Sequence, residues 1–216
     1  MKIKHVGLFL ANLAKPFHSV FISERRKKIL VEHLLQQLPR GETLHGLDVG
    51  CGNGKLASFL QQSNPGLLID GVDVLTFDNQ LLKNAMKFDG KKLPFKDNSY
   101  DFVMLIDVLH HSHDPADLLR ECARVANKFV LIKDHLCQSQ WDKIRLSWMD
   151  WVGNRAYNVS LPFNFMPEPE WQALFNAIGV TSTMKKDGFN LYPWPFSVLF
   201  EDKLHFIAKI SVHNKK

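Results

Sequence analysis

Short apolar runs alternate along this chain with stretches in which apolar residues recur every three or four positions. The runs are predicted to be β-strands because they have the length of a strand and are bounded by turn residues. The run Phe102–Ile106 holds only apolar side chains, which is typical of a strand buried on both faces. The five predicted strands are Leu44–Val49, Leu67–Val72, Ala85–Phe88, Phe102–Ile106 and Phe129–Lys133.

Helical spacing fills the intervals between these runs. Phe17–Leu38 is predicted to be a helix, and Pro39–Gly41 ends it. Ala116–Ala126 is predicted to be a second helix, with Asp114 as the N-cap and Pro115 at the first helical position. Further helices are expected after the first strand, to about Leu60, and over Glu168–Ala177. The apolar side expected for the first helix consists of Val20, Ile29, Leu30, Leu34, Leu35 and Leu38.

Strands that alternate with helices predict an α/β fold, a doubly wound and mostly parallel sheet with helices on both faces. No repeat or low-complexity linker divides the 216 residues, so the chain is expected to be a single domain. Such sheets bind ligands beyond the carboxyl ends of their strands. The residues that end each strand are therefore the place to look for chemistry.

Composition narrows the class of protein. The 45% hydrophobic and 23% charged residues are ordinary for a globular protein, and no stretch approaches the ~20 apolar residues that span a membrane. The N-terminus is expected to be mature sequence and not a signal peptide. Cys51, Cys122 and Cys137 are odd in number and widely spaced, which favours a reducing compartment and a cytoplasmic location.

The net charge and the histidine content do not identify a binding partner. The net charge of +5 is compatible with nucleic acid or an anionic membrane as a partner, but the basic residues are spread out and are interpreted as solvated surface. Their small clusters are Arg25–Lys28, Lys185–Lys186 and Lys215–Lys216. His110, His111 and His113 lie close together, yet no second ligand group accompanies them, so no metal site is expected.

The first predicted strand ends in the glycine-rich segment Asp48–Lys55, which reads Asp-Val-Gly-Cys-Gly-Asn-Gly-Lys. Glycines at alternate positions let the backbone turn tightly and approach a ligand, and the following helix offers free N–H groups. The dinucleotide motif G-x-G-x-x-G would need glycine where Lys55 stands. The phosphate-binding loop G-x-x-x-x-G-K-[ST] would need glycine at Val49 and a hydroxyl at Leu56. Both motifs are excluded.

Acidic residues end the next two strands. Asp73 follows the second strand, where a carboxylate can accept hydrogen bonds from vicinal ribose hydroxyls. Asp89 follows the third strand and precedes Gly90, so a carboxylate and a backbone N–H stand side by side there. That pair is suited to the exocyclic amine and a ring nitrogen of adenine, although an Asp-Gly pair alone is only a turn signal.

With these residues the chain resembles the class I S-adenosylmethionine-dependent methyltransferases. Leu47–Gly54 is similar to the first motif of that family. Asp89–Asp101 resembles the methyltransferase type-11 subgroup that includes the ubiquinone and menaquinone biosynthesis methyltransferases. Val108–His111 and Asp114-Pro115 continue the match, and the resemblance spans about Leu44–Asp134.

The resemblance implies a Rossmann-like, seven-stranded sheet whose last strand is antiparallel, with Val180–Met184 and His205–Val212 as the final two strands. It implies a division into an N-terminal helical extension (1–42), a cofactor-binding half (43–134) and a substrate-side segment with C-terminal strands (135–216). It also implies S-adenosylmethionine as cofactor. Asp48 and Gly50–Gly54 would contact its methionine part, Asp73 the ribose, Asp89 with Gly90 the adenine, and Asp107 the sulfonium. The implied cofactor-binding residues are Asp48, Gly50, Cys51, Gly52, Asn53, Gly54, Asp73, Val74, Asp89, Gly90 and Asp107.

Methyl transfer is an in-line displacement, so positioning and desolvation provide much of its acceleration. A hydroxyl or ammonium acceptor must also lose a proton, and histidine is the natural base. His111 and His135 follow or flank strand ends and are the candidate catalytic residues, with no proton transfer assigned.

The segment Leu136–Pro167 is rich in aromatic residues. It is interpreted either as a substrate cover or as a helix, Trp141–Val152, with its aromatics packed on the sheet. The aromatic residues are Trp141, Trp148, Trp151, Tyr157, Phe163 and Phe165.

The preferred hypothesis is an enzyme that methylates a small, apolar or amphipathic acceptor, because an aromatic cover suits such a molecule. An RNA methyltransferase is the first alternative, since the chain is basic. A pseudo-enzyme that binds the cofactor without turnover is the second. A nicotinamide-dependent reductase ranks last because of Lys55.

Overall fold

The computed structural model describes residues 23–154, 161–177, 181–201 and 203–212, and a seven-stranded sheet forms its centre. The strand order is β3-β2-β1-β4-β5-β7-β6. The pairs β2–β3, β1–β2, β1–β4 and β4–β5 are parallel, and β7 runs antiparallel to both β5 and β6. The expected Rossmann-like sheet with an antiparallel last strand is confirmed. The strands are β1 (Leu44–Val49), β2 (Leu67–Asp73), β3 (Ala85–Lys87), β4 (Tyr100–Ile106), β5 (Ala126–His135), β6 (Thr181–Lys185) and β7 (His205–Ser211).

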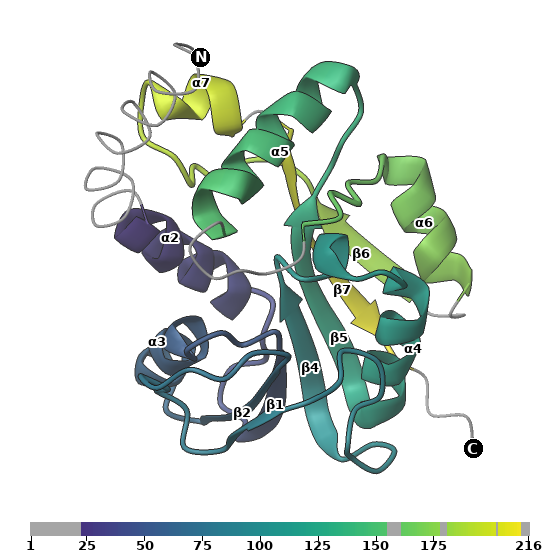
Figure 1. Cartoon of the computed structure of the whole chain (residues 1–216). Helices are drawn as coiled ribbons and strands as arrows, with labels where there is room; N and C mark the ends of the chain where they lie inside the picture. The colour runs from purple at the N-terminus through teal and green to yellow at the C-terminus, as the bar shows by residue number, and fades with distance from the viewer. Residues whose placement is uncertain (1–22, 155–160, 178–180, 202, 213–216) are drawn as a thin grey trace.

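Helices cover both faces of this sheet (Figure 1). In that view α2 and α3 lie on one side and α4 and α6 on the other, while α5 and α7 lie at the upper end, toward which β4 and β5 point. None of the helices in the described ranges is long and apolar enough to cross a membrane. The helices are α2 (Ser23–Leu35), α3 (Lys55–Ser63), α4 (Pro115–Val125), α5 (Gln140–Asn154), α6 (Glu168–Ala177) and α7 (Phe196–Phe200), with a 3-10 turn, η2, at Leu109–His111.

The continuous apolar run of β4 is explained by cores on both of its faces. Phe102 and Met104 pack in the core that includes Leu34 of α2 and Leu60 of α3. Val103 and Leu105 point the other way, into the core shared with α4 and α6. Alternate residues of a strand face opposite sides of a sheet, so a strand between two helical layers must be apolar throughout.

The predicted elements agree with the structure at most boundaries. α4 begins at Pro115, and Asp114 caps it by accepting a hydrogen bond from the backbone N–H of Asp117. β5 is longer at both ends than the predicted Phe129–Lys133, because it pairs with β7 as far as His135 and with β4 from Ala126 onward. Of the predicted helix Phe17–Leu38, residues 17–22 lie outside the described residues, and the helix ends at Leu35.

A glycine in β1 makes room for an aromatic stack. Gly46 pairs with Phe102 across the sheet, and a Cβ at Gly46 would lie 2.3–2.8 Å from three atoms of the Phe102 ring. That ring stacks on Phe129 at 5.5 Å between centroids, with both side chains buried, so it has little freedom to move. The packing of β1, β4 and β5 therefore depends on the missing side chain.

Gly46→Ala should lower the free energy of unfolding by about 1–3 kcal/mol, because overpacking a filled core forces side chains and backbone to shift. Urea denaturation measures the change. Gly153→Ala on α5 is the matched control, since a Cβ there meets nothing within 4 Å and alanine favours a helix. Equal stability of Gly46→Ala and the wild type would contradict the packing argument.

Candidate functional site

The glycine-rich loop between β1 and α3 is held in an unusual backbone conformation. Gly50, Gly52 and Gly54 have φ values of 77°, 54° and 76°, in the left-handed region that L side chains rarely adopt. At Gly50 an added Cβ would also lie 2.5 Å from Val108, just beyond β4. The loop therefore brings bare backbone to the carboxyl edge of the sheet, where a ligand can approach closely.

Asp73, at the end of β2, is joined to this loop. One of its carboxylate oxygens accepts the backbone N–H of Gly52 at 2.8 Å, and the other accepts that of Leu75 at 2.9 Å. Each oxygen keeps a second lone pair, so the carboxylate can still accept hydrogen bonds from two hydroxyls of a ligand. The structure thus brings together the two parts that the sequence predicts, the glycine loop and the ribose acceptor.

Asp48 lies inside β1, below the loop, and is 3% exposed. Burial, with a further contribution from the negative charge of Asp73, raises the pKa of Asp48 to about 8. The carboxyl group is therefore protonated at neutral pH. A positively charged group brought near it would favour the ionised form.

Gln80 fixes the next segment against the loop. Its side-chain amide donates to the carbonyl of Gly52 at 3.0 Å, and its carbonyl accepts the N–H groups of Leu81 and Leu82. Burial raises the pKa of the Cys51 thiol to about 12, so Cys51 is an unreactive filler in this loop. Asn53 accepts a hydrogen bond from the N–H of Lys55 at 3.3 Å, which starts α3.

Val74, Asp89 and Gly90 form a second group of predicted residues. A Cβ at Gly90, whose φ is 78°, would lie 3.1 Å from a methyl of Val74, so the two loops after β2 and β3 touch. Asp89 is exposed, and one oxygen accepts the N–H groups of Lys91 and Lys92. This is the turn geometry that an Asp-Gly pair predicts. The other oxygen of Asp89 can accept a hydrogen bond from an amine.

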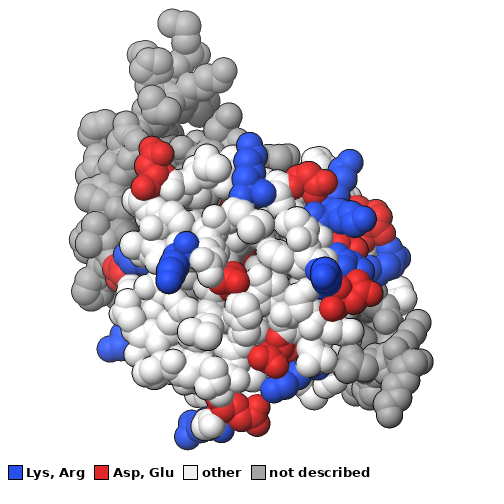
Figure 2. Space-filling view, turned by 90° about the horizontal axis from the view of Figure 1, so that it is seen from below, with Lys and Arg blue, Asp and Glu red and all other residues white. Residues whose placement is uncertain are grey.

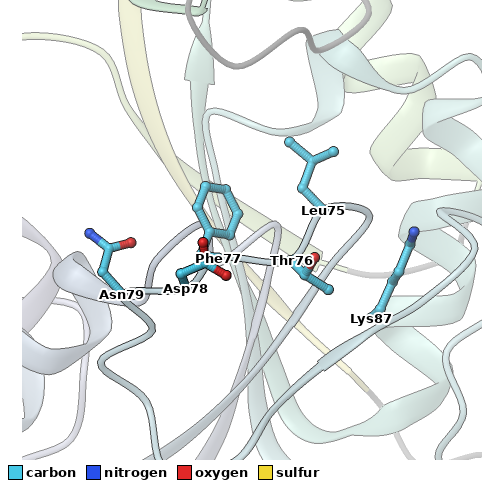
Figure 3. A pocket seen from close by; sticks show the side chains of 6 residues that line it. All are labelled: Leu75, Thr76, Phe77, Asp78, Asn79 and Lys87. Carbon is cyan, nitrogen blue, oxygen red and sulfur yellow. The ribbon is translucent and has the colours of Figure 1, made fainter.

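An open hollow of about 560 Å³ lies beside these loops (Figure 3). The segment Leu75–Asn79 forms one wall, and Lys87 from β3 lies across from it. The hollow begins two residues after Asp73 but does not include it or the glycine loop. It is therefore an extension of the candidate site, next to the position expected for adenine.

Asp107 ends β4 in a group of buried charges. Its φ of 58° is rare outside glycine, and it turns the carboxylate toward Arg26 of α2, at 2.5 Å, and toward the ammonium of Lys133. Burial alone would raise the pKa of Asp107, but Lys133 and Arg26 hold it well below its usual value. The side chain of Lys133 is 1% exposed and that of Asp107 is 23% exposed, so the ammonium is held out of water and the carboxylate is partly accessible.

His135 contacts the same carboxylate, with its Nε2 3.3 Å from Asp107. Burial and the nearby Lys133 hold the pKa of His135 well below its usual value, so the ring is neutral. His111 lies elsewhere, half-buried on η2, with its Nε2 3.3 Å from Asp150 of α5. The two predicted catalytic histidines therefore belong to different groups of charges.

His110 connects these two groups. Its Nδ1 is 2.7 Å from Asp134, whose carboxylate also accepts the N–H groups of Leu109 and His135. Burial would lower the pKa of His110, but Asp134 and Asp150 raise it to about 10. Phe165 stacks on the His110 ring at 5.1 Å. The segment after residue 160 thus covers the histidines.

The aromatic residues of the predicted cover divide into two sets. Phe165 contacts the rings of His110 and His135, and Phe163 lies 6.2 Å from Phe165 between ring centroids. Asn164 between them donates to the carbonyl of Ser112 at 2.8 Å. Tyr157 lies outside the described residues. The predicted helix is present as α5, but its tryptophans do not pack on the sheet. Trp141, Trp148 and Trp151 are 58%, 49% and 42% exposed.

Arg26, Lys133, Asp134 and Asp150 are polar residues of the site that the strand-end rule left out. Lys133 and Asp134 follow an apolar run just as Asp73 and Asp107 do, so the same rule identifies them once β5 is read to its end. Arg26 and Asp150 lie on helices far away in the sequence, and nothing in their local pattern indicates the site.

The basic charge of the chain does not gather on the face at the amino ends of the parallel strands. Figure 2 shows that face with Lys and Arg interspersed with Asp and Glu and separated by uncharged surface. A nucleic-acid footprint is a continuous basic patch or stripe. This face lacks one among the residues that the structure describes.

Asp48 generates a testable dependence of stability on pH. In the native state the group holds its proton up to about pH 8, whereas in the unfolded chain it ionises near 3.8. Its contribution to the free energy of unfolding is therefore greatest below pH 3.8 and is lost as the pH rises through about 8. Asp48→Asn stays neutral, so its stability relative to the wild type should rise across this range.

Urea denaturation of both proteins at several pH values measures this difference. Asp117→Asn, an exposed position on α4, is the control and should show no comparable trend. Parallel stability curves for Asp48→Asn and the wild type would contradict a raised pKa at Asp48.

Comparisons with known proteins agree with this geometry. Residues 47–129 match the family described as methyltransferase domain. A tRNA (carboxymethyluridine(34)-5-O)-methyltransferase of Schizosaccharomyces pombe is 36% identical over 88 residues, which cover 38% of this chain and 35% of that protein. A ubiquinone biosynthesis O-methyltransferase of Bordetella parapertussis is 30% identical over 91 residues, 37% of each chain. The similarity thus covers little more than a third of the length of these relatives.

Solved structures share the fold over nearly the whole chain. A chain in the complex of the Haloferax volcanii Trm112 methyltransferase activator with a methyltransferase superposes with a TM-score of 0.66 at 17% identity, covering 88% of this chain and 92% of that one. A SAM-dependent methyltransferase from Aquifex aeolicus gives 0.61 at 18% identity, covering 94% and 98%. The expected resemblance is confirmed. Residues 47–129 match the methyltransferase domain family, and the chain shares its fold with SAM-dependent methyltransferases of known structure.

Proposed function

We propose that this chain transfers the methyl group of S-adenosylmethionine to a small, apolar or amphipathic acceptor. The observation that carries the proposal is the hydrogen bond between Asp73 and the N–H of Gly52, because it joins the ribose acceptor to the glycine loop at the carboxyl edge of the sheet. Ligands of open α/β sheets bind at that edge. A cytoplasmic location is proposed with it, on the odd and widely spaced cysteines.

In this proposal the cofactor lies along the strand ends. Asp48 and the loop Gly50–Gly54 contact its methionine part, Asp73 binds the ribose, and the touching loops of Val74 and Gly90, with Asp89, hold the adenine. The cofactor carries a positive sulfonium, so its charge stabilises the ionised form of Asp48. Asp107 lies beside the sulfonium, where its negative charge offsets part of the positive charge of Arg26 and Lys133.

The acceptor enters from the side of α5 and the segment 161–167. Phe163 and Phe165 offer apolar surface there, and His111 and His135 stand below them with no proton transfer assigned. The acceptor atom attacks the methyl carbon in line with the carbon–sulfur bond, and that bond's electrons stay on sulfur to give S-adenosylhomocysteine. Burial of these groups excludes water, which favours transfer to the acceptor.

An RNA acceptor is the second candidate. It is favoured by the similarity to the Schizosaccharomyces pombe protein, whose printed name gives tRNA as its acceptor. The apolar surface of Phe163 and Phe165 supports the small-molecule acceptor instead. The two candidates share the cofactor site and differ only in what α5 and the segment 161–167 contact.

Calorimetric titration of the full chain tests the cofactor half. S-adenosylmethionine and S-adenosylhomocysteine should bind and NADH should not. Asp73→Ala should weaken both adenosyl ligands at least about tenfold, because hydrogen bonds to a charged group contribute about 1.5–3 kcal/mol each. Asp73→Asn keeps an acceptor for Gly52 and should have a smaller effect.

Asp117→Ala, which removes an exposed carboxylate on α4, is the matched control and should bind as the wild type does. A wild-type protein that binds neither adenosyl ligand would refute the proposed cofactor. Unchanged affinity in Asp73→Ala would refute the ribose role.

Transfer of labelled methyl from S-adenosylmethionine into cell extract tests the acceptor. The label should enter solvent-extractable small molecules and depend on Asp73, because the aromatic surface of Phe163 and Phe165 suits an apolar molecule. Label confined to the RNA fraction, with salt-sensitive RNA binding, would replace this acceptor by the second candidate. Cofactor binding without any labelled product would indicate a pseudo-enzyme.

A further inference from the structure

Two consecutive histidines converge on one carboxylate beside the cofactor edge. His110 and His111 lie in η2, shortly after β4, and both turn their Nε2 atoms toward the same oxygen, Oδ1, of Asp150 on α5. The two distances are 3.6 and 3.3 Å. The side chains of His110 and Asp150 are 2% and 6% exposed, and that of His111 is 23% exposed.

These contacts have the wrong length for strong hydrogen bonds. A charge-assisted N–H to carboxylate bond is about 2.7–2.9 Å long, and both contacts exceed that range. The two distances instead match the separation between neighbouring ligand atoms of a tetrahedral metal ion. Ligand atoms at about 2.1 Å from a zinc ion, with tetrahedral angles, are separated by about 3.4 Å. The three ligand atoms all lie within 4.8 Å of one another.

The surrounding groups prepare the ligands as in metal sites. Asp134 accepts the Nδ1–H of His110 at 2.7 Å, so Nε2 is the nitrogen that would bind a cation, with loss of its proton. A metal-binding histidine usually has such a carboxylate on its other nitrogen. Asn154, one turn along α5, donates to Oδ1 of Asp150 at 2.7 Å and orients that carboxylate.

Asp150 provides an independent sign of a missing ligand. Its Oδ2 is buried and has no hydrogen-bond partner among the described residues. An unpaired buried carboxylate oxygen destabilises the fold, since it has lost its hydrogen bonds to water and forms none within the protein. The two histidines face Oδ1, which already accepts from Asn154, so a cation between them gives Oδ2 a partner when both carboxylate oxygens of Asp150 bind it.

We propose that His110, His111 and Asp150 bind a divalent transition-metal ion, with Zn²⁺ as the best fit to two imidazoles and one carboxylate. Hard ions such as Mg²⁺ and Ca²⁺ prefer oxygen ligands, so two nitrogens disfavour them. Three protein ligands leave one position of a tetrahedral ion open, as in metal sites that bind a water or a substrate oxygen.

The sequence conceals this site because its third ligand lies far from the histidines. His113, the other histidine of the segment, is exposed and takes no part. None of the three ligands is a residue to which we assign cofactor contacts. The metal site therefore stands or fails separately from cofactor binding.

Cobalt titration of the full-length, tag-free protein, stripped with a chelator, tests the site. One equivalent of Co²⁺ should bind and give the intense visible absorption of tetrahedral coordination, and Zn²⁺ should displace it. Asp150→Asn and His111→Gln should each weaken binding at least tenfold and abolish the absorption. His113→Gln is the matched control and should leave both unchanged.

Circular dichroism establishes that each variant folds. If Asp150→Asn does not fold, His111→Gln, at a half-buried position, still tests the proposal. Binding that survives both variants would reveal surface histidines as the ligands and overturn the proposal. Wild-type protein without stoichiometric Co²⁺ or Zn²⁺ binding would overturn it as well. Neither result depends on S-adenosylmethionine.

Discussion

The parallel register of the central strands is the constraint on which the site depends. β1 pairs with β2 on one side and β4 on the other, and β4 pairs with β5, all in the same direction. Their carboxyl ends therefore meet at one edge. Asp73, Asp107 and Lys133 come from separate strands. They lie along this edge because parallel pairing aligns the carboxyl ends of their strands. The apolar strand interiors give that register its strength, since a slip by one residue would turn every side chain to the wrong face.

Burial of charge adds a second constraint, which acts on the helices. Lys133 is almost fully enclosed, and a buried cation without a partner is strongly destabilising. Asp107 provides that partner, and Arg26 completes the group from α2. Lys55, at the start of α3, also binds Glu24 of α2 at 2.7 Å. The N-terminal helix is thus tied to the cofactor edge by charge as well as by its apolar side.

The two halves of the site are built differently. The proposed cofactor half consists of loops that directly follow strands, so neighbours in sequence become neighbours in space, as Asp73 and Leu75 illustrate. The acceptor half combines η2, the end of β5, α5 and the segment 161–167. Only the packed fold brings these parts together. Differences in acceptor between related proteins can therefore arise in α5 and its neighbours without disturbing the cofactor edge.

Local sequence alone determined the strands, the helix starting at Pro115, the glycine loop and the acidic residues at strand ends. These features follow from short-range physics: side-chain alternation, the left-handed backbone that Gly50 allows, and the capping of a helix by Asp114. Each is visible within a few residues, and so the fold class was predictable and the cofactor half could be proposed.

Tertiary structure decided the rest. The length of β5 depended on its pairing with β7, and the outward position of Trp141 and Trp148 depended on where α5 packs. The meeting of Asp150 with the histidines of η2 has no local signal at all. Contacts between distant segments are set by the shapes and charges of whole packed layers, and a pattern along one segment does not contain that information.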